Sequence, residues 1–352
     1  MTLRLGAVLL AVALAACGGK GNKGKTTPGG GKAGDSQSMT DKDPDGGGTG
    51  TGTGGTDAAG GTLPDAGGGT GGDPTGPSIT APNLDMDPAQ AKVQVDAHLT
   101  IAKNALAAPT PDAETALREA RAALAIDAAN VDAAAYVAFA YYHKKLYDTA
   151  ELVLDDLFKR EAAKTNANVY YVYGLVYDHT NRPERAVLAY RKAVEINPNH
   201  SSALVNLGVH QLKNSQYAEA QTTFERLTQQ FNRKDAITLT SLGSAYRGRS
   251  ADYRSGAPER DQFVRTAEAS YKRALQANGS YGPAYYNLGL LYLDTDPYPG
   301  VADPMQRLNA SKAFFEQYKN MPGVDIKLFD SRMKDVDRAI KRVQKQQKKK
   351  TT

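Results

Sequence analysis

The sequence predicts an all-α protein built from stacked pairs of antiparallel helices, and three observations support this. Apolar side chains recur at helical spacing from residue 97 onward. The pattern returns about every 34 residues, and small residues hold fixed places within it. By contrast, residues 18–88 are mainly Gly, Thr, Asp, Lys and Pro. The 352-residue chain is therefore expected to carry one helical region behind a polar extension.

The clearest repeat covers residues 167–200 and predicts two helices. Large side chains at helical spacing are expected to fill the interface between them. Small residues are expected where the two backbones cross closely, and a proline ends the second helix. In chain order these residues are Tyr170, Tyr173, Gly174 and Tyr177, then Ala186, Tyr190, Ala193 and Pro198.

This spacing resembles the tetratricopeptide repeat (TPR), which implies a right-handed superhelix of helix pairs. Further units are expected at about 97–130, 131–164, 201–234, 236–281 and 282–324. They form a predicted TPR domain over residues 89–324. In the last unit, Ala310 and Phe314 are expected at the places of Ala186 and Tyr190. The 97–130 unit lacks the Gly and Tyr of the first helix, as expected of a terminal repeat.

Residues 325–352 are predicted to form a final capping helix and a basic tail. Over 325–347 the apolar residues lie on one helical stripe, which would cover the open end of the repeat stack. The Lys-rich tail is expected to be solvated, with a nucleic-acid or lipid contact as the alternative. The stripe consists of Ile326, Phe329, Met333, Val336, Ile340 and Val343.

The N-terminus predicts export and lipid attachment. Residues 1–16 have a positive start at Arg4 and an apolar run over 5–14, which is too short to span a bilayer but suits a signal peptide. The residues Leu14, Ala15, Ala16 and Cys17 resemble the lipobox of bacterial lipoproteins. That resemblance implies a lipid on Cys17. The Gly18-Gly19 pair favours the periplasmic face of the outer membrane.

Residues 17–88 are predicted to form a disordered Gly/Thr-rich linker that tethers the folded region to the lipid. Residues 19–26 match the phosphate-loop pattern GxxxxGK[ST]. That motif requires a preceding strand and a following helix to direct backbone amides at phosphate. Neither is expected here, so we assign no nucleotide site to it.

Composition and motifs favour no catalytic, cofactor or metal site. Cys17 is the only cysteine, which excludes an intramolecular disulfide and a Cys/His zinc site. The five histidines form no HExxH motif, and no GxSxG motif occurs. His143 and His179 hold equivalent repeat positions and could respond to pH. The net charge of +5 does not demand nucleic acid, and no small-molecule substrate is indicated.

The sequence instead favours protein binding on the inner face of the superhelix, which the first helix of each unit lines. We expect a tyrosine-rich surface suited to a peptide or a helix. The predicted contacts are Phe139, Tyr142, His143, Tyr171, Leu175, Asp178, His179, Asn206, Val209, Tyr286, Asn287 and Leu290. Two insertions, 250–261 and 295–303, interrupt the repeats, and Tyr298 in the second is predicted to be an exposed loop contact.

A more specific resemblance comes from residues 288–300, LGLLYLDTDPYPG, together with the later strings QRL and EQYKNMPG. With the lipobox and the tether, these resemble the TPR lipoprotein of the adventurous gliding-motility machinery of gliding bacteria. The resemblance implies a scaffold that binds other envelope proteins. Two alternatives remain open: a pilotin-like assembly factor for a type IV pilus or secretin, and a periplasmic adaptor for a cell-wall enzyme.

The lipid-anchor hypothesis predicts that Cys17→Ala releases the protein from membranes without unfolding it, because the anchor and the helical core share no residues. Fractionation of cells followed by a salt wash measures this. A variant that stays in the membrane fraction would contradict the hypothesis.

Overall fold

A computed structural model describes residues 86–351 of the chain. This part holds thirteen α-helices and no β-strand. The predicted signal peptide, Cys17 and nearly all of the predicted tether lie outside the described residues. The prediction of an all-α stack of helix pairs is confirmed.

The helices follow one another with short connections. In chain order they are α1 (Pro88–Ala107), α2 (Ala113–Ile126), α3 (Val131–His143), α4 (Tyr147–Phe158), α5 (Ala167–His179), α6 (Pro183–Ile196), α7 (Ser201–Lys213), α8 (Tyr217–Gln229), α9 (Ala236–Arg249), α10 (Pro258–Ala277), α11 (Gly282–Asp294), α12 (Pro304–Lys319) and α13 (Ile326–Thr351). Two short 3-10 helices, Glu161–Thr165 and Ser250–Asp252, lie between them.

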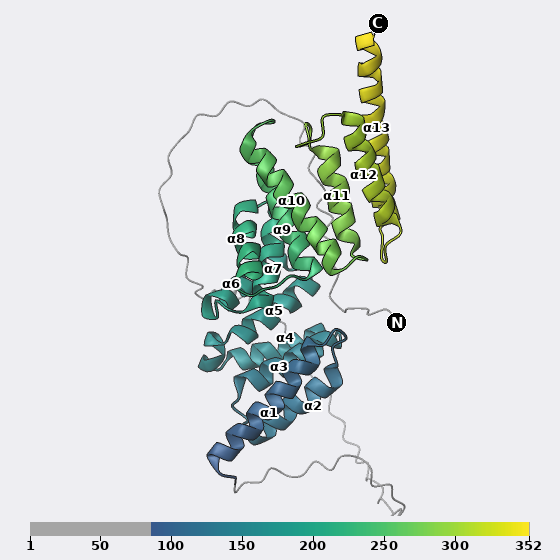
Figure 1. The fold of residues 1–352 in the computed structure, drawn as a ribbon. Helices are drawn as coiled ribbons and strands as arrows, with labels where there is room; N and C mark the ends of the chain where they lie inside the picture. Colours follow the sequence, from purple (N-terminus) through teal and green to yellow (C-terminus); the bar gives the residue numbers. More distant parts are fainter. Residues whose placement is uncertain (1–85, 352) are drawn as a thin grey trace, which may run out of the picture. The chain divides into compact units, whose positions relative to one another are not determined.

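Each helix packs against the next in the chain, so the molecule is built from hairpins of helices (Figure 1). The first helix of a hairpin also contacts the first helix of the next one, as α3 does with α5 and α7 with α9. In α3, α5, α9 and α11, the first helix of a hairpin therefore packs against both helices of the preceding hairpin. The first helices form one continuous layer, and this layer positions the site described below.

A glycine on the first helix makes room for a ring from the second helix in four of these hairpins. A Cβ atom added at Gly174 would lie 2.4 Å from the Tyr190 ring, and one added at Gly208 would lie 2.7 Å from Phe224. Gly243 meets Tyr271 at 2.6 Å, and Gly289 meets Phe315 at 2.6 Å. Real Cβ atoms do not approach carbon that closely, so only glycine fits. The predicted close approach is thus between a backbone and an aromatic ring.

The turn between the two helices of a hairpin uses the same backbone device three times. Lys145, Asn181 and Ser215 adopt φ values of 62°, 58° and 59°. The amide of the following residue donates to a carbonyl five residues back, as Gln216 N does to Gln211 O at 2.8 Å. This bond satisfies a carbonyl that the end of the helix leaves without a partner.

The predicted register of the last repeat is wrong by one residue. Phe315 and Ser311 are fully buried, whereas Phe314 and Ala310 are only partly buried. Phe315 is the ring that fills the Gly289 position, and the Ser311 hydroxyl donates to the Gly289 carbonyl oxygen at 2.8 Å. The insertion before α12 shifts the register, and only the packing partner of Gly289 reveals the shift.

The two insertions pack against each other. The Ser255 hydroxyl donates to the Asp296 carbonyl at 3.0 Å, and Arg260 Nη1 donates to the Pro297 carbonyl at 3.1 Å. The expectation of an exposed Tyr298 is wrong. Its side chain is 4% exposed, its ring stacks on Tyr292, and its hydroxyl donates to Glu268 at 2.8 Å.

The final helix, α13, packs on α12 through the predicted apolar stripe. Phe329 and Val336 are buried there, and Met333 and Ile340 are partly buried, whereas Ile326 at the start is 47% exposed. Among residues 86–351 no helix is long and apolar enough to cross a membrane.

The glycine packing predicts a strong effect of a single substitution. Gly208→Leu should lower the free energy of unfolding by about 3 kcal/mol, because the new side chain must displace the Phe224 ring. Urea denaturation measures this. Gly279→Leu is the matched control, because a Cβ there meets nothing closer than 3.7 Å, and it should change stability by less than about 0.5 kcal/mol. Equal midpoints for the two variants would contradict the glycine-ring account.

Candidate functional site

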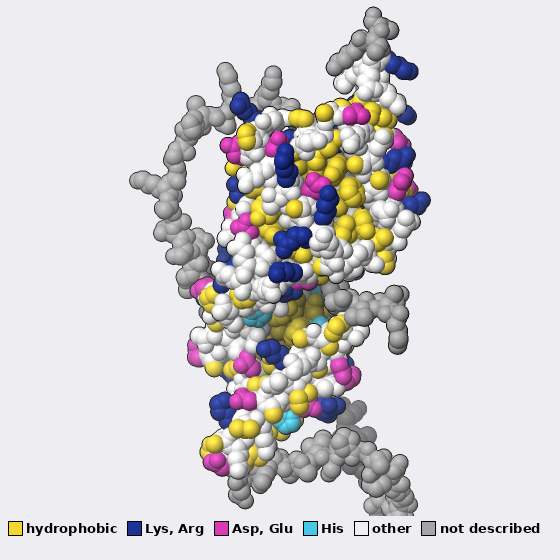
Figure 2. Space-filling view, in the orientation of Figure 1, with side chains coloured by type: hydrophobic (Ala, Val, Ile, Leu, Met, Phe, Trp, Pro, Cys, Tyr) yellow, Lys and Arg dark blue, Asp and Glu magenta, His cyan; other side chains and the backbone are white. Residues whose placement is uncertain are grey.

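The described residues enclose a groove with a volume of about 420 Å³ along the layer of first helices. Its walls come from α3, α5, α7, α9 and α11, and the start of α13 closes one end. Figure 2 shows part of this hollow, where hydrophobic side chains gather beside histidines. The groove runs across several hairpins because each hairpin contributes the same face of its first helix.

Eleven of the twelve predicted inner-face residues line this groove. They are Phe139, Tyr142, His143, Tyr171, Leu175, Asp178, His179, Asn206, Val209, Tyr286 and Asn287. Leu290 does not line it. That side chain is 1% exposed and belongs to the core cluster between α11, α12 and α13. Whether the eleven residues contact a partner remains a prediction.

An aromatic and imidazole cluster forms the α3–α5 end of the groove. The Phe139 and His143 rings lie 4.7 Å apart, and the Tyr142 hydroxyl lies 3.1 Å from His179 Nδ1. Burial, together with the nearby His179, lowers the pKa of His143 to about 4. His143 is therefore neutral at pH 7. Its Nε2 atom is buried without a hydrogen-bond partner in the structure, so it could bond to a group placed in the groove.

Asp178 joins three helices at the floor of the groove. Its carboxylate accepts a hydrogen bond from the Tyr190 hydroxyl of α6 at 2.9 Å. The same carboxylate lies 2.9 Å from His210 Nε2 of α7, and that imidazole is only 4% exposed. The Asp178 carboxylate is therefore occupied by internal bonds. Its charge positions α6 and α7 around the groove.

Lys213 lies at the end of α7 and lines the groove. Its ammonium forms no ion pair with any of the described residues. Burial lowers the pKa of its ammonium, and the negative charge of Asp178 offsets only part of that decrease. By contrast, Arg233 pairs with Asp235 at 3.1 Å. A half-buried ammonium without an ion pair favours a carboxylate ligand.

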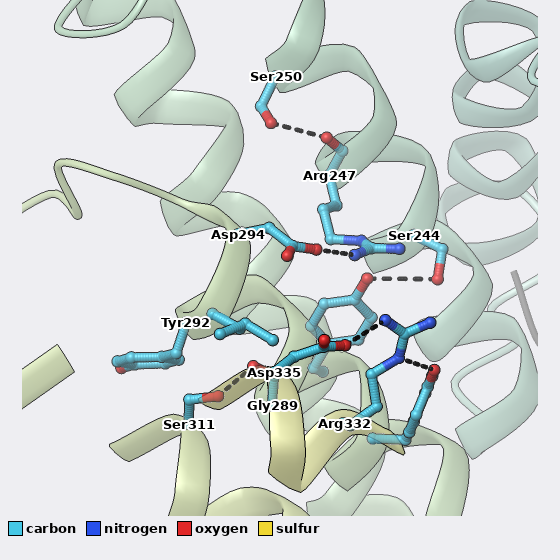
Figure 3. A network of polar contacts seen from close by, with 12 residues as sticks. Ser244, Arg247, Ser250, Gly289, Tyr292, Asp294, Ser311, Arg332 and Asp335 are labelled. Carbon is cyan, nitrogen blue, oxygen red and sulfur yellow. Dashed lines mark hydrogen bonds and ion pairs between the residues drawn. The ribbon is translucent and has the colours of Figure 1, made fainter. Parts of the chain in front are cut away.

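A polar network holds α13 at the other end of the groove. Arg332 Nε donates to the Tyr286 hydroxyl at 3.2 Å, and Arg332 Nη1 pairs with Asp335 at 3.0 Å. Figure 3 shows these arginine contacts beside the longer pair of Arg247 and Asp294, which lie 3.5 Å apart. Tyr286 is 5% exposed, so it forms the wall of the groove and offers little surface to a ligand.

The prediction missed the contribution of α9 to the groove. Thr240 and Ser244 stand at the repeat positions that Tyr171 and Leu175 occupy in the 167–200 unit. Their repeat positions could therefore have placed them on the inner face. They were missed because the prediction favoured large and aromatic side chains, and these two are small and polar. His210 was missed for another reason, because its partner Asp178 lies in the preceding hairpin. Lys213 was missed because its electrostatic neighbour is that same Asp178.

Among the described residues, no group of three or more His, Cys, Asp or Glu side chains is placed to hold a metal ion. The groove offers rings, one free-standing ammonium and one imidazole nitrogen without a partner. Such a set can hold an apolar segment and orient it through a few polar contacts.

Comparison with known protein families gives one match, which includes part of the groove. A model of the family of anaphase-promoting complex, cyclosome, subunit 3 matches residues 143–227. That stretch runs from the end of α3 through most of α8 and covers less than half of the chain. No curated protein sequence matches the chain.

Several solved structures are similar in fold. PilF of Pseudomonas aeruginosa is 17% identical, with a TM-score of 0.50, covering 70% of this chain and 99% of PilF. PilW, a type IV pilus biogenesis factor, is 17% identical with a TM-score of 0.43, covering 61% and 92% of the two chains. YrrB, a TPR protein with an unusual peptide-binding site, is 21% identical with a TM-score of 0.37, covering 56% and 95%. At these identities the likeness is one of fold. The helical region of this chain has the TPR fold.

The buried imidazole predicts a pH-dependent stability. His143 has a pKa of about 4 when folded and about 6.5 when unfolded. The unfolded chain therefore binds the proton more tightly, and acidification from about pH 6.5 to pH 4 lowers the free energy of unfolding. In His143→Gln this loss should shrink by about 1–2 kcal/mol, a figure reduced for the partial exposure of the ring. Chemical denaturation at several pH values measures it. Parallel stability curves for the two proteins would contradict the assignment.

Proposed function

We propose that this protein is a membrane-anchored TPR scaffold that binds a segment of another envelope protein in its groove. The observation that carries the proposal is the groove itself, with walls of Phe139, Tyr142, Tyr171 and Leu175 at one end. Rigid aromatic side chains on fixed helices supply contact area at little cost in conformational entropy.

The form of the groove favours a peptide or helix over a small metabolite. Side chains from five successive first helices line it, so the surface is elongated along the stack. Most of the exposed groove surface is apolar, which suits recognition by a row of apolar anchors.

The charged side chains of the groove indicate which kind of peptide segment can bind there. Lys213 lies beside the apolar residues Val209 and Leu212 at the groove wall, and within residues 86–351 its ammonium has no ion pair. Asp178 is already bonded to Tyr190 and His210. The ligand that fits is an apolar or aromatic segment that carries a carboxylate near Lys213.

The most specific support for a particular machine is the sequence of residues 288–300, at the end of α11 and in the following turn. This stretch, the lipobox and the Gly-rich tether resemble the TPR lipoprotein of the adventurous gliding-motility machinery. We propose that the protein is anchored by lipid on Cys17 at the periplasmic face of the outer membrane. There it would hold subunits of a gliding complex.

A second candidate is an assembly factor for a type IV pilus or secretin. It is favoured by the fold shared with PilF, at a TM-score of 0.50. Detergent extraction of the envelope and affinity purification of the protein distinguish the candidates, because motility subunits, secretin or cell-wall hydrolases would co-purify respectively. A deletion strain that loses secretin oligomers but still glides would overturn the gliding assignment.

Crosslinking in cells tests the groove directly. A photo-crosslinking residue at Asn206 or Val209 should trap a partner, because both side chains line the groove and are partly exposed. The same residue at Leu152, which is 69% exposed on α4 and lies outside the groove, is the matched control and should trap little. Equal adducts from Leu152 and Val209 would contradict a groove-bound partner.

The carboxylate assignment is tested in the same assay. Lys213→Glu should reduce the adduct formed at Val209 by about tenfold or more, since it places like charges together in the groove. Lys234→Glu changes the charge equally at an exposed position and should leave the adduct unchanged. A Lys213→Glu protein that crosslinks normally would contradict the acidic contact while leaving the groove assignment intact.

A further inference from the structure

The C-terminal half of α13 forms a basic surface that is not part of the groove. From Arg338 to Lys350 the chain has seven Lys or Arg residues and no Asp or Glu. Ile340 is the last residue of this helix that packs on a core cluster. Figure 1 shows the last turns of α13 extending past the ends of α11 and α12. At 1.5 Å per residue, residues 341–351 rise about 16 Å beyond that last core contact.

Six of the seven basic residues share one side of the helix. At about 100° per residue, they fall within an arc of about 120°. The apolar stripe of α13 lies on the opposite side, where Phe329 and Val336 pack into the core. The basic side therefore faces away from the repeat stack. We call it the basic face; it consists of Arg338, Lys341, Arg342, Lys345, Lys348 and Lys349.

Among the described residues, Arg338, Lys341, Arg342 and Lys345 of the basic face share a single ion pair. Arg338 pairs with Asp335 at 3.5 Å, but Lys341, Arg342 and Lys345 are exposed and lie beyond the last acidic residue, Asp337. Like charges at i and i+4, as in Lys341 and Lys345 or Lys345 and Lys349, destabilise an isolated helix. An anionic surface would relieve this repulsion and stabilise the last turns.

We propose that the basic face of α13 is a second membrane contact, which adsorbs to anionic lipid headgroups. The inference uses the envelope location of the proposed function but does not depend on the groove. Juxtamembrane clusters of several Lys and Arg residues bind anionic leaflets through the summed electrostatic attraction. A one-sided face on a straight helix presents these charges together to a flat surface.

The chemistry of the face favours lipid over a protein partner. Specific protein interfaces use aromatic or aliphatic anchors that fill pockets. The only apolar residue between Lys341 and Thr351 is Val343, which is partly buried. The remaining neutral positions are mainly glutamine. The face has charge without an anchor, and charge alone suits a fluid anionic surface.

Vesicle sedimentation tests the proposal. The chain from residue 17 onward, without the predicted signal peptide and with Cys17→Ser so that no lipid is attached, is mixed with phosphatidylcholine vesicles with or without phosphatidylglycerol. We expect binding only to the anionic vesicles and loss of binding in high salt, because screening shortens the reach of the charges. Equal binding to both kinds of vesicle would overturn the proposal.

Matched variants locate the contact. Changing Lys341, Arg342, Lys345 and Lys349 together to Gln should weaken binding to anionic vesicles by about tenfold or more. Gln preserves helix propensity, so the helix remains. The control changes four exposed basic residues elsewhere to Gln, with the same loss of charge, and should bind within about twofold of the parent. The control residues are Lys103, Lys234, Arg265 and Arg273.

Two further measurements complete the test. Amide hydrogen exchange of residues 341–351 should slow on anionic vesicles and stay unchanged on neutral ones, which reports contact by this helix itself.

A DNA duplex at equal phosphate concentration is the competing polyanion, and tighter binding to DNA than to the vesicles would overturn the lipid assignment. The groove crosslinks from Val209 do not involve the basic face of α13, so failure here leaves the proposed groove function standing.

Discussion

The contact between a glycine on the first helix and an aromatic ring on the second sets the geometry on which the rest of the helical region depends. At Gly174, Gly208, Gly243 and Gly289 the ring lies where a Cβ atom would otherwise be. Removing that atom lets the two helices approach closely and locks the ring in one position. The device recurs in four of the five hairpins whose first helices line the groove. The groove follows from that repetition.

The same rings also connect the core to the groove. Tyr190 fills the Gly174 position and carries its hydroxyl to Asp178 on the groove floor. Tyr271 fills the Gly243 position, and its hydroxyl donates to Ser244, which lines the groove. Where the ring is Phe224, no hydroxyl is present, and Thr223 beside it donates to Gln211 instead. Packing and polar contacts are therefore coupled through single side chains.

The molecule presents two surfaces of different chemistry. The groove is mainly apolar, its Asp178 carboxylate is bonded internally, and the Lys213 ammonium has no ion pair among the described residues. The distal half of α13 is basic on one side and has no exposed apolar anchor. The start of α13 closes the groove through Arg332 and Tyr286, while its end leaves the stack. One helix thus separates a surface suited to a protein segment from one suited to an anionic membrane.

The sequence by itself determined the helical hairpins, the position of the small residues, the final helix and eleven of the inner-face residues. Helical periodicity is a local property, so spacing along the chain is enough to recover it. Only the tertiary structure decided that Ser311 and Phe315 complete the last repeat, that Tyr298 is buried against Glu268, and that Asp178 bonds to His210. These outcomes depend on contacts between residues far apart in the chain. An insertion erases the local spacing there, and no periodic pattern reports which distant side chain fills a given space.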